Sequence, residues 1–80
     1  MTYDWDISRQ ATEKIIGLPK KHRNQIIHFL DRLGMDPQGL TEATFYDASG
    51  ALHQMATVNS WVVTFVVDDP VKRIHIIAIE

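Results

Sequence analysis

The stretch Trp61–Glu80, WVVTFVVDDPVKRIHIIAIE, decides the fold, because it holds two apolar runs around one polar turn. The runs Trp61–Val67 and Ile74–Ile79 are rich in β-branched and aromatic residues, which favour strands. Asp68-Asp69-Pro70 separates the two runs, and a proline, which cannot donate to a strand ladder, is typical of a turn. The pattern predicts two neighbouring antiparallel strands at the core of a sheet.

Alternation along these two strands predicts a sheet that is apolar on both faces. Successive side chains point to opposite faces of a strand. In the first run Trp61, Val63, Phe65 and Val67 oppose Val62, Thr64 and Val66, and in the second Ile74, Ile76 and Ala78 oppose His75, Ile77 and Ile79. A sheet with one face in water would alternate apolar and polar residues instead. We therefore expect helices on one face and a second cover on the other.

The N-terminal part of the chain predicts a strand followed by a helical hairpin over 9–33. Apolar and polar residues alternate over Thr2–Ser8, as in an edge strand with one solvent-exposed face. Ser8 is a suitable N-cap for the helix that follows. A first helix is expected from Arg9 to Leu18, and Pro19 suits the first turn of a second helix. The apolar stripe of that second helix is Ile26, Ile27, Leu30 and Leu33, with Phe29 beside it.

The middle of the chain is expected to end the hairpin and return to the sheet. Gly34 is the expected C′ residue of the second helix, followed by a loop over Pro37–Thr44. Phe45-Tyr46-Asp47 is a candidate strand start, Leu52–Val58 reads as a strand, and Asn59-Ser60 forms a tight hairpin turn. The prediction is an α+β fold in the order β-α-α-β-β-β, with the helical hairpin packed on a small, mainly antiparallel sheet.

Composition narrows the classes of protein and of site. The 80 residues suit a single domain over 1–80, and without cysteine there is neither a disulfide framework nor a thiolate metal site. No stretch approaches the about 18 consecutive apolar residues of a membrane span, and the N-terminus is no signal peptide, so we expect a soluble cytoplasmic protein. The histidines show no metal-ligand spacing, and we expect neither a metal nor a cofactor. The net charge of −2 restricts any RNA contact to a local basic patch.

The order and spacing of several short sequence segments point to a family resemblance. These segments are ISRQATEKIIGLPKKHRNQIIHFLDRLGMDP at 7–37, a glycine-containing turn, NSWVVTFVVDD at 59–69 and IHIIAIE at 74–80. Together they resemble the RelE/ParE superfamily of toxins from bacterial type II toxin–antitoxin systems. The resemblance implies the toxin fold and one of two activities: cleavage of messenger RNA in the ribosomal A site, or inhibition of DNA gyrase. It also implies an antitoxin whose tail wraps the toxin.

The active-site pattern of that family is not reproduced. RelE-like members usually carry an arginine near the end of the strand before the hairpin turn and another after the next aromatic residue. Here the first region is Met55-Ala56-Thr57-Val58, Val62 follows Trp61, and the sequence stops at Glu80, where a family tail with tyrosine or histidine would begin. Two functions therefore stay open: a toxin that cuts messenger RNA or, second, inhibits gyrase, and a non-catalytic protein-binding module on the toxin fold.

His53, His75 and Arg73 are the candidate catalytic residues. Cleavage through a 2′-hydroxyl needs a base, an acid and a cation near the phosphate, and the near-neutral pKa of histidine suits the first two roles. His53 and His75 lie on separate predicted strands and could project to the same face, with Arg73 near the turn before His75. The alternative is that both are ordinary sheet histidines.

The basic run and the second sheet face are candidate binding surfaces. Lys20, Lys21 and Arg23 open the second helix, where they would contact ribosomal RNA or messenger RNA or would simply be a solvated helix face. Exposed, the second sheet face would form an apolar patch that is unusual on a monomer. We expect another chain to bury it, either an antitoxin-like protein or a second copy. The residues expected at that interface are Trp61, Val62 and Val66.

Overall fold

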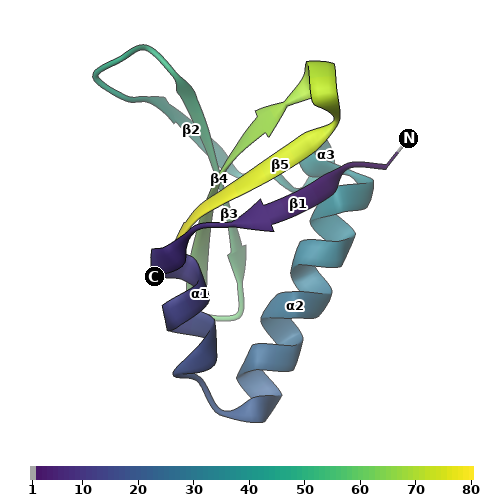
Figure 1. The fold of residues 1–80 in the computed structure, drawn as a ribbon, viewed down its shortest axis with the longest axis vertical. Helices are drawn as coiled ribbons and strands as arrows, with labels where there is room; N and C mark the ends of the chain where they lie inside the picture. The colour runs from purple at the N-terminus through teal and green to yellow at the C-terminus, as the bar shows by residue number, and fades with distance from the viewer. Residues whose placement is uncertain (1) are drawn as a thin grey trace.

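The computed structural model describes residues 2–80 and confirms the predicted α+β architecture (Figure 1). Its elements are β1 (Asp4–Ile7), α1 (Arg9–Ile16), α2 (Lys20–Met35), α3 (Pro37–Leu40), β2 (Ala43–Tyr46), β3 (Leu52–Val58), β4 (Trp61–Asp68), the 3₁₀ turn η1 (Asp69–Val71) and β5 (Arg73–Ile79). The strands form one sheet in the order β1-β5-β4-β3-β2. Strand β1 is an edge and runs parallel to β5, while the other neighbours are antiparallel.

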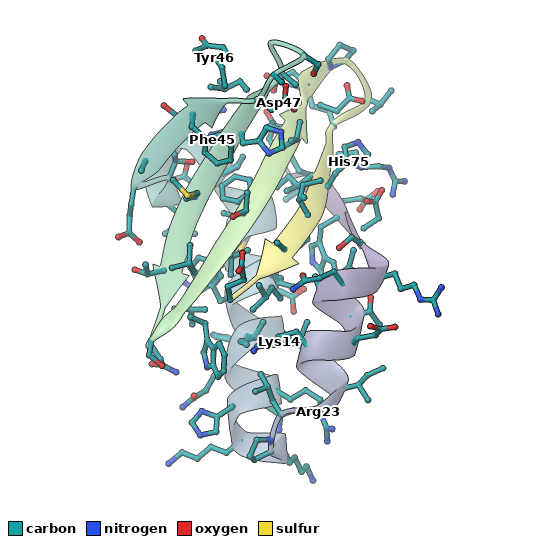
Figure 2. The ribbon with its side chains drawn as sticks, turned by 90° about the vertical axis from the view of Figure 1, so that its left-hand side faces the viewer. Lys14, Arg23, Phe45, Tyr46, Asp47 and His75 are labelled. Carbon is teal, nitrogen blue, oxygen red and sulfur yellow. The ribbon has the colours of Figure 1, made fainter. Side chains whose placement is uncertain are left out.

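The hydrophobic core lies between this sheet and the helices α1 and α2, which cover one face only. Figure 2 shows both helices behind the strands. The buried apolar side chains are Ala11, Ile15, Ile26, Phe29, Leu30, Leu33, Ala56, Val63, Phe65, Ile74, Ile76 and Ile79. Full burial of such a side chain contributes about 1.5–3 kcal/mol. In the described part of the chain, no helix is long and apolar enough to cross a membrane.

The helical hairpin begins as predicted and departs in its middle. Ser8 caps α1, because its side chain accepts a hydrogen bond from the backbone N–H of Ala11. Helix α1 ends at Ile16, before the predicted Leu18, with Gly17 as its C-cap. Pro19 lies at the N-cap of α2 and not in its first turn, because its ψ of 151° is non-helical.

Gly34 is inside α2, so its prediction as the C′ residue was wrong. The helix continues to Met35 and ends at Asp36, whose N–H donates to the carbonyl of Arg32. Gly34 is buried because β1 crosses the helix there, and its carbonyl accepts a 2.7 Å hydrogen bond from the N–H of Tyr3. A Cβ atom on Gly34 would lie 2.7 Å from the carbonyl oxygen of Tyr3. Glycine is therefore needed here for close packing, not for a turn.

The predicted loop over Pro37–Thr44 also contains regular structure. The side chain of Asp36 accepts a hydrogen bond from the N–H of Gly39 and so caps the short helix α3, which begins at Pro37. Strand β2 starts at Ala43, earlier than predicted, and pairs with β3. The sheet therefore has one strand more than the predicted order contains.

A β-bulge in β5 changes which side chains face the core. The register around it pairs Val63 with Ile79, Thr64 with Ala78, and Phe65 with Ile76. Ile77 is the extra residue, and a bulge of this kind shifts the alternation by one position. Ile79 is therefore buried in the core, and the prediction that Ala78 shares a face with Ile74 and Ile76 was wrong.

Candidate functional site

The sheet face that the helices leave bare is called the open face here. Figure 2 looks onto it from the front. The strand register and the alternation of buried positions place on it Asp6, Phe45, His53, Met55, Thr57, Val62, Thr64, Val66, Arg73, His75 and Ala78. The face is polar toward one end and apolar toward the other, so its two ends suit different chemistry.

His75 lies at the polar end between two carboxylates from neighbouring strands. Its Nδ1 is 2.9 Å from Oδ1 of Asp6 on β1, and its Nε2 is 3.7 Å from Oδ2 of Asp68 on β4. Arg73 adds an ion pair of 3.4 Å to Asp6. The hydrogen bond from His75 is the main cause, and that from Arg73 a further one, that lowers the pKa of Asp6 below its ordinary value. Asp6 is therefore ionised near neutral pH and orients the imidazole.

His53 has its own carboxylate, Asp47, in the turn between β2 and β3. Oδ2 of Asp47 accepts a 2.8 Å hydrogen bond from Nε2 of His53, whose ring stacks on Phe45 at 4.9 Å between centroids. Oδ1 of Asp47 accepts from the hydroxyl and N–H of Ser49 and from the N–H of Ala51. The hydrogen bond from the Ser49 hydroxyl, followed by that from His53, holds the pKa of Asp47 far below its ordinary value.

Asp47 is a site residue that our sequence reasoning missed. The turn Asp47-Ala48-Ser49-Gly50 carried the signal, because an aspartate at the start of a turn commonly bonds the backbone two residues on. Because Nε2 of His53 is engaged by Asp47, Nδ1 is the second ring nitrogen to account for. That atom is buried and has no hydrogen-bond partner within residues 2–80.

The two histidines share the open face but belong to separate clusters. Strand β4 lies between β3 and β5, and neighbouring strands are about 4.8 Å apart, so the two backbones are about 10 Å apart. The side chain of Val66 on β4, which pairs with His75, stands on the same face between them. The two histidines are therefore not in mutual contact.

The basic run lies away from both histidine clusters. Lys20 and Lys21 are exposed and Arg23 is half-buried in the first turn of α2. In Figure 2 Arg23 lies at the end of the molecule opposite to Phe45, Asp47 and His75. The structure therefore does not combine the predicted RNA-binding residues and the predicted catalytic residues in one site.

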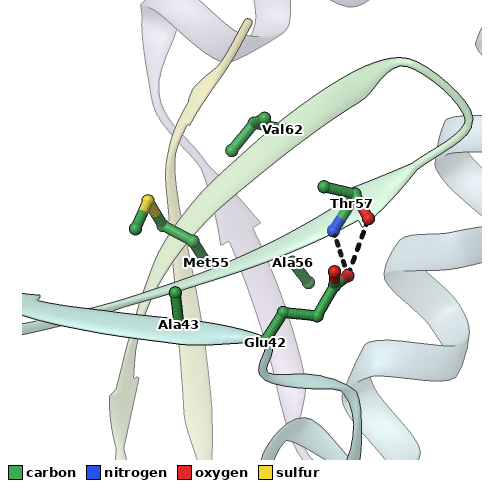
Figure 3. A pocket seen from close by; sticks show the side chains of 6 residues that line it. All are labelled: Glu42, Ala43, Met55, Ala56, Thr57 and Val62. Atoms are coloured by element: carbon green, nitrogen blue, oxygen red, sulfur yellow. Dashed lines mark hydrogen bonds between the residues drawn. The ribbon is translucent and has the colours of Figure 1, made fainter.

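The apolar end of the open face contains a pocket of about 370 Å³ (Figure 3). Its lining residues are Glu42, Ala43, Met55, Ala56, Thr57 and Val62. Both regions in which the resembling family carries its arginines, 55–58 and 62, contribute to this lining. No lysine or arginine lines the pocket, and the one charged group is the carboxylate of Glu42. The lining cannot neutralise a phosphate.

The predicted interface residues divide between the two faces of the sheet. Val62 and Val66 lie on the open face, and the Val62 side chain is exposed. Trp61 packs on the helix side, where Nζ of Lys14 lies 4.9 Å from the centroid of its ring. An interface on the open face would include Val62 and Val66 but not Trp61, and the interface role of all three residues stays a prediction.

Solved structures share this fold over almost the whole chain. A chain of the RelBE2 toxin–antitoxin complex from Mycobacterium tuberculosis matches with a TM-score of 0.85 and 14% identity, over 100% of this chain and 98% of that one. The archaeal RelE–RelB complex from Pyrococcus horikoshii gives 0.81 and 23%, over 100% and 94%. A mutant of the Escherichia coli toxin RelE in the free state gives 0.73 and 18%, over 99% and 82%.

These likenesses confirm the predicted resemblance at the level of the fold, which is that of the RelE toxins. No protein-family model matches the sequence, and no curated protein matches it. Since one fold supports many functions, the activity has to be argued from the residues of the site.

Proposed function

We propose that this chain, with its RelE toxin fold, is the toxin component of a toxin–antitoxin pair and binds an antitoxin-like protein through its open face. The observation that carries the proposal is a set of exposed apolar side chains on the open face, on a sheet whose other face is already covered by the helices. Structures with the same fold include toxin–antitoxin complexes, which supports a protein partner. We place the pair in the cytoplasm.

Burial of apolar surface is the driving force in this proposal. Phe45 and Val62 keep 41% and 36% of their surface exposed. Removing apolar surface from water contributes about 25 cal/mol per Å², so a partner that covers this face gains affinity without a new ion pair. The ionised Asp6 and the half-exposed Arg73 at the polar end provide orientation more than affinity.

A binding experiment with a matched control tests the proposal. Where a neighbouring gene encodes a small protein, that protein is mixed with the purified chain, and the complex is measured by size exclusion with light scattering. Val62→Glu should abolish the complex, whereas Ile16→Glu, at an exposed apolar position on α1, should leave it intact. A complex that survives Val62→Glu, or a self-dimer that this substitution dissolves, would refute an antitoxin on this face.

Ribosome-dependent cleavage of messenger RNA is the second candidate, favoured by the two histidine–aspartate pairs. In this version His53 and His75 exchange protons and Arg73 contacts the phosphate, while Lys20, Lys21 and Arg23 contact ribosomal RNA. Inducing the chain alone in a bacterial host should then arrest growth, and purified protein should cut messenger RNA on translating ribosomes. His53→Ala and His75→Ala should each lower the cleavage rate.

Separate outcomes distinguish the remaining alternatives. Arrested growth with intact messenger RNA and lowered DNA supercoiling would favour gyrase as the target. Undisturbed growth together with a stable antitoxin-like complex would favour a non-catalytic binding module on the toxin fold. The absence of a cation from the pocket supports this last alternative over cleavage there.

A further inference from the structure

The pocket at the apolar end of the open face combines an apolar wall with an acidic rim. Met55, Ala43 and Val62 provide apolar side chains, and Thr57 lies beside Glu42 (Figure 3). At about 370 Å³ the space is large enough for one or two aliphatic side chains of another chain. Its chemistry therefore differs from that of the histidine clusters at the other end of the face.

Glu42 is held in place as a carboxylate. Its Oε2 accepts two hydrogen bonds from Thr57, one from the N–H and one from the hydroxyl, each of 2.7 Å. The backbone hydrogen bond first, and then the hydroxyl, lower the pKa of Glu42 below its ordinary value. Both bonds use the same oxygen, which leaves Oε1 as the acceptor for a ligand.

Glu80 adds a second carboxylate next to the pocket. Its backbone forms a pair of hydrogen bonds with Val62, of 2.7 and 2.9 Å. Because Ile79 points into the core, alternation directs the side chain of Glu80 to the open face. Within residues 2–80 neither Glu42 nor Glu80 forms an ion pair, so this rim carries negative charge without a counter-charge.

We propose that this pocket binds a segment of a partner protein in which an apolar side chain is flanked by lysine or arginine. The apolar group fills the space between Met55 and Val62, and the cation pairs with Glu42 or Glu80. Complementary charge fixes the orientation of the segment, and burial of the apolar group supplies affinity. The same carboxylates repel phosphate, so nucleic acid is excluded from this place. This proposal rests on the proposed function only in taking the ligand to be a protein. It adds the chemistry of the segment by which that protein binds.

Two short peptides with the same leucines provide the test, one with lysines beside the leucines and one with glutamates. Each is titrated into isotope-labelled protein, and backbone amide shifts are followed by NMR. The lysine peptide should shift the signals of Thr57 and Val62 and bind about tenfold more tightly than the glutamate peptide. Equal or tighter binding of the glutamate peptide, shifts confined to other residues, or displacement by single-stranded RNA would overturn the proposal.

Variants of Glu42 and Glu80 test the role of charge while leaving the structure of the pocket intact. Glu42→Gln keeps an oxygen that accepts from Thr57 but removes the charge, and Glu80→Gln removes the second charge without touching the pocket wall. Each should weaken the lysine peptide several-fold, while Glu13→Gln on α1, in an exposed pair with Arg9, should not. Unchanged affinity in both rim variants would refute the cation partner. Peptide binding without an antitoxin complex would contradict the proposed function alone.

Discussion

The two faces of the central strands are both largely apolar in sequence but differ in how far the structure buries them. On the helix face Val63, Phe65 and Ile74 are fully buried, whereas on the open face Val62 is exposed and Val66 is half-buried. The first set contributes to the stability of the monomer. The second set contributes little to that stability, because it remains partly in water. Apolar character in a strand thus predicts burial, but not whether folding or binding provides it.

Substitution of a core side chain should produce the largest effect and test that division directly. Phe65→Ala should lower the free energy of unfolding by about 3–5 kcal/mol, because it removes a fully buried ring and leaves a cavity. Val62→Ala on the open face should cost about 1 kcal/mol at most. Chemical denaturation of the purified monomer measures both, and similar losses for the two variants would refute the comparison.

The second largest loss of stability should come from a substitution at the contact between β1 and α2, where Gly34 lies. Gly34→Ala should destabilise by about 1–3 kcal/mol, because the new Cβ would lie 2.7 Å from the Tyr3 carbonyl oxygen. Gly17→Ala is the matched control. Its Cβ would lie 3.5 Å from the carbonyl oxygen of Glu13, an ordinary contact, so it should be neutral or gain up to about 1 kcal/mol. Stabilisation by Gly34→Ala would show that β1 does not approach the helix this closely.

The polar end of the open face should contribute a smaller, pH-dependent stability. The pKa of Asp6 is lower in the folded state than its ordinary 3.8, mainly because of His75. The stabilisation is therefore complete above the ordinary pKa and is lost as the pH falls through the lower, folded value. The stability advantage of the unmodified protein over Asp6→Asn should shrink below about pH 4. Denaturation curves at several pH values measure this, and a difference that stays constant with pH would contradict it.

The basic run, which lies on neither sheet face, should affect stability least. Replacing Lys20, Lys21 and Arg23 with alanine should change the free energy of unfolding by less than about 1 kcal/mol, with a slight gain because cations are unfavourable at a helix N-terminus. If these residues contact nucleic acid, RNA affinity should fall with salt, and the triple variant should flatten that dependence. If neither salt nor the triple substitution changed the RNA affinity, the basic run would be an ordinary solvent-exposed helix surface.

The pattern of residues was sufficient to predict the fold class and most of the elements, because those elements are locally consistent. Ser8 caps a helix, the stripe that ends in Leu30 and Leu33 is helical, and Asn59-Ser60 turns between two strands, as the structure confirms. The site was less predictable. His53 and His75 do share one face, but Asp6 and Asp47, which orient them, come from segments that are distant in sequence or irregular.

The sequence by itself determined the helical hairpin, the strand-rich C-terminal part and the apolar nature of both sheet faces, because propensity and alternation are local properties. Only the tertiary structure decided which face the helices cover. It also fixed the bulge at Ile77 that turns Ile79 inward, and it showed that Gly34 serves a contact and not a helix end. These features depend on register and on close approach between segments far apart in the chain. The same long-range geometry separates the histidine clusters from the basic run and brings Glu42, Glu80 and Val62 to one end of the open face.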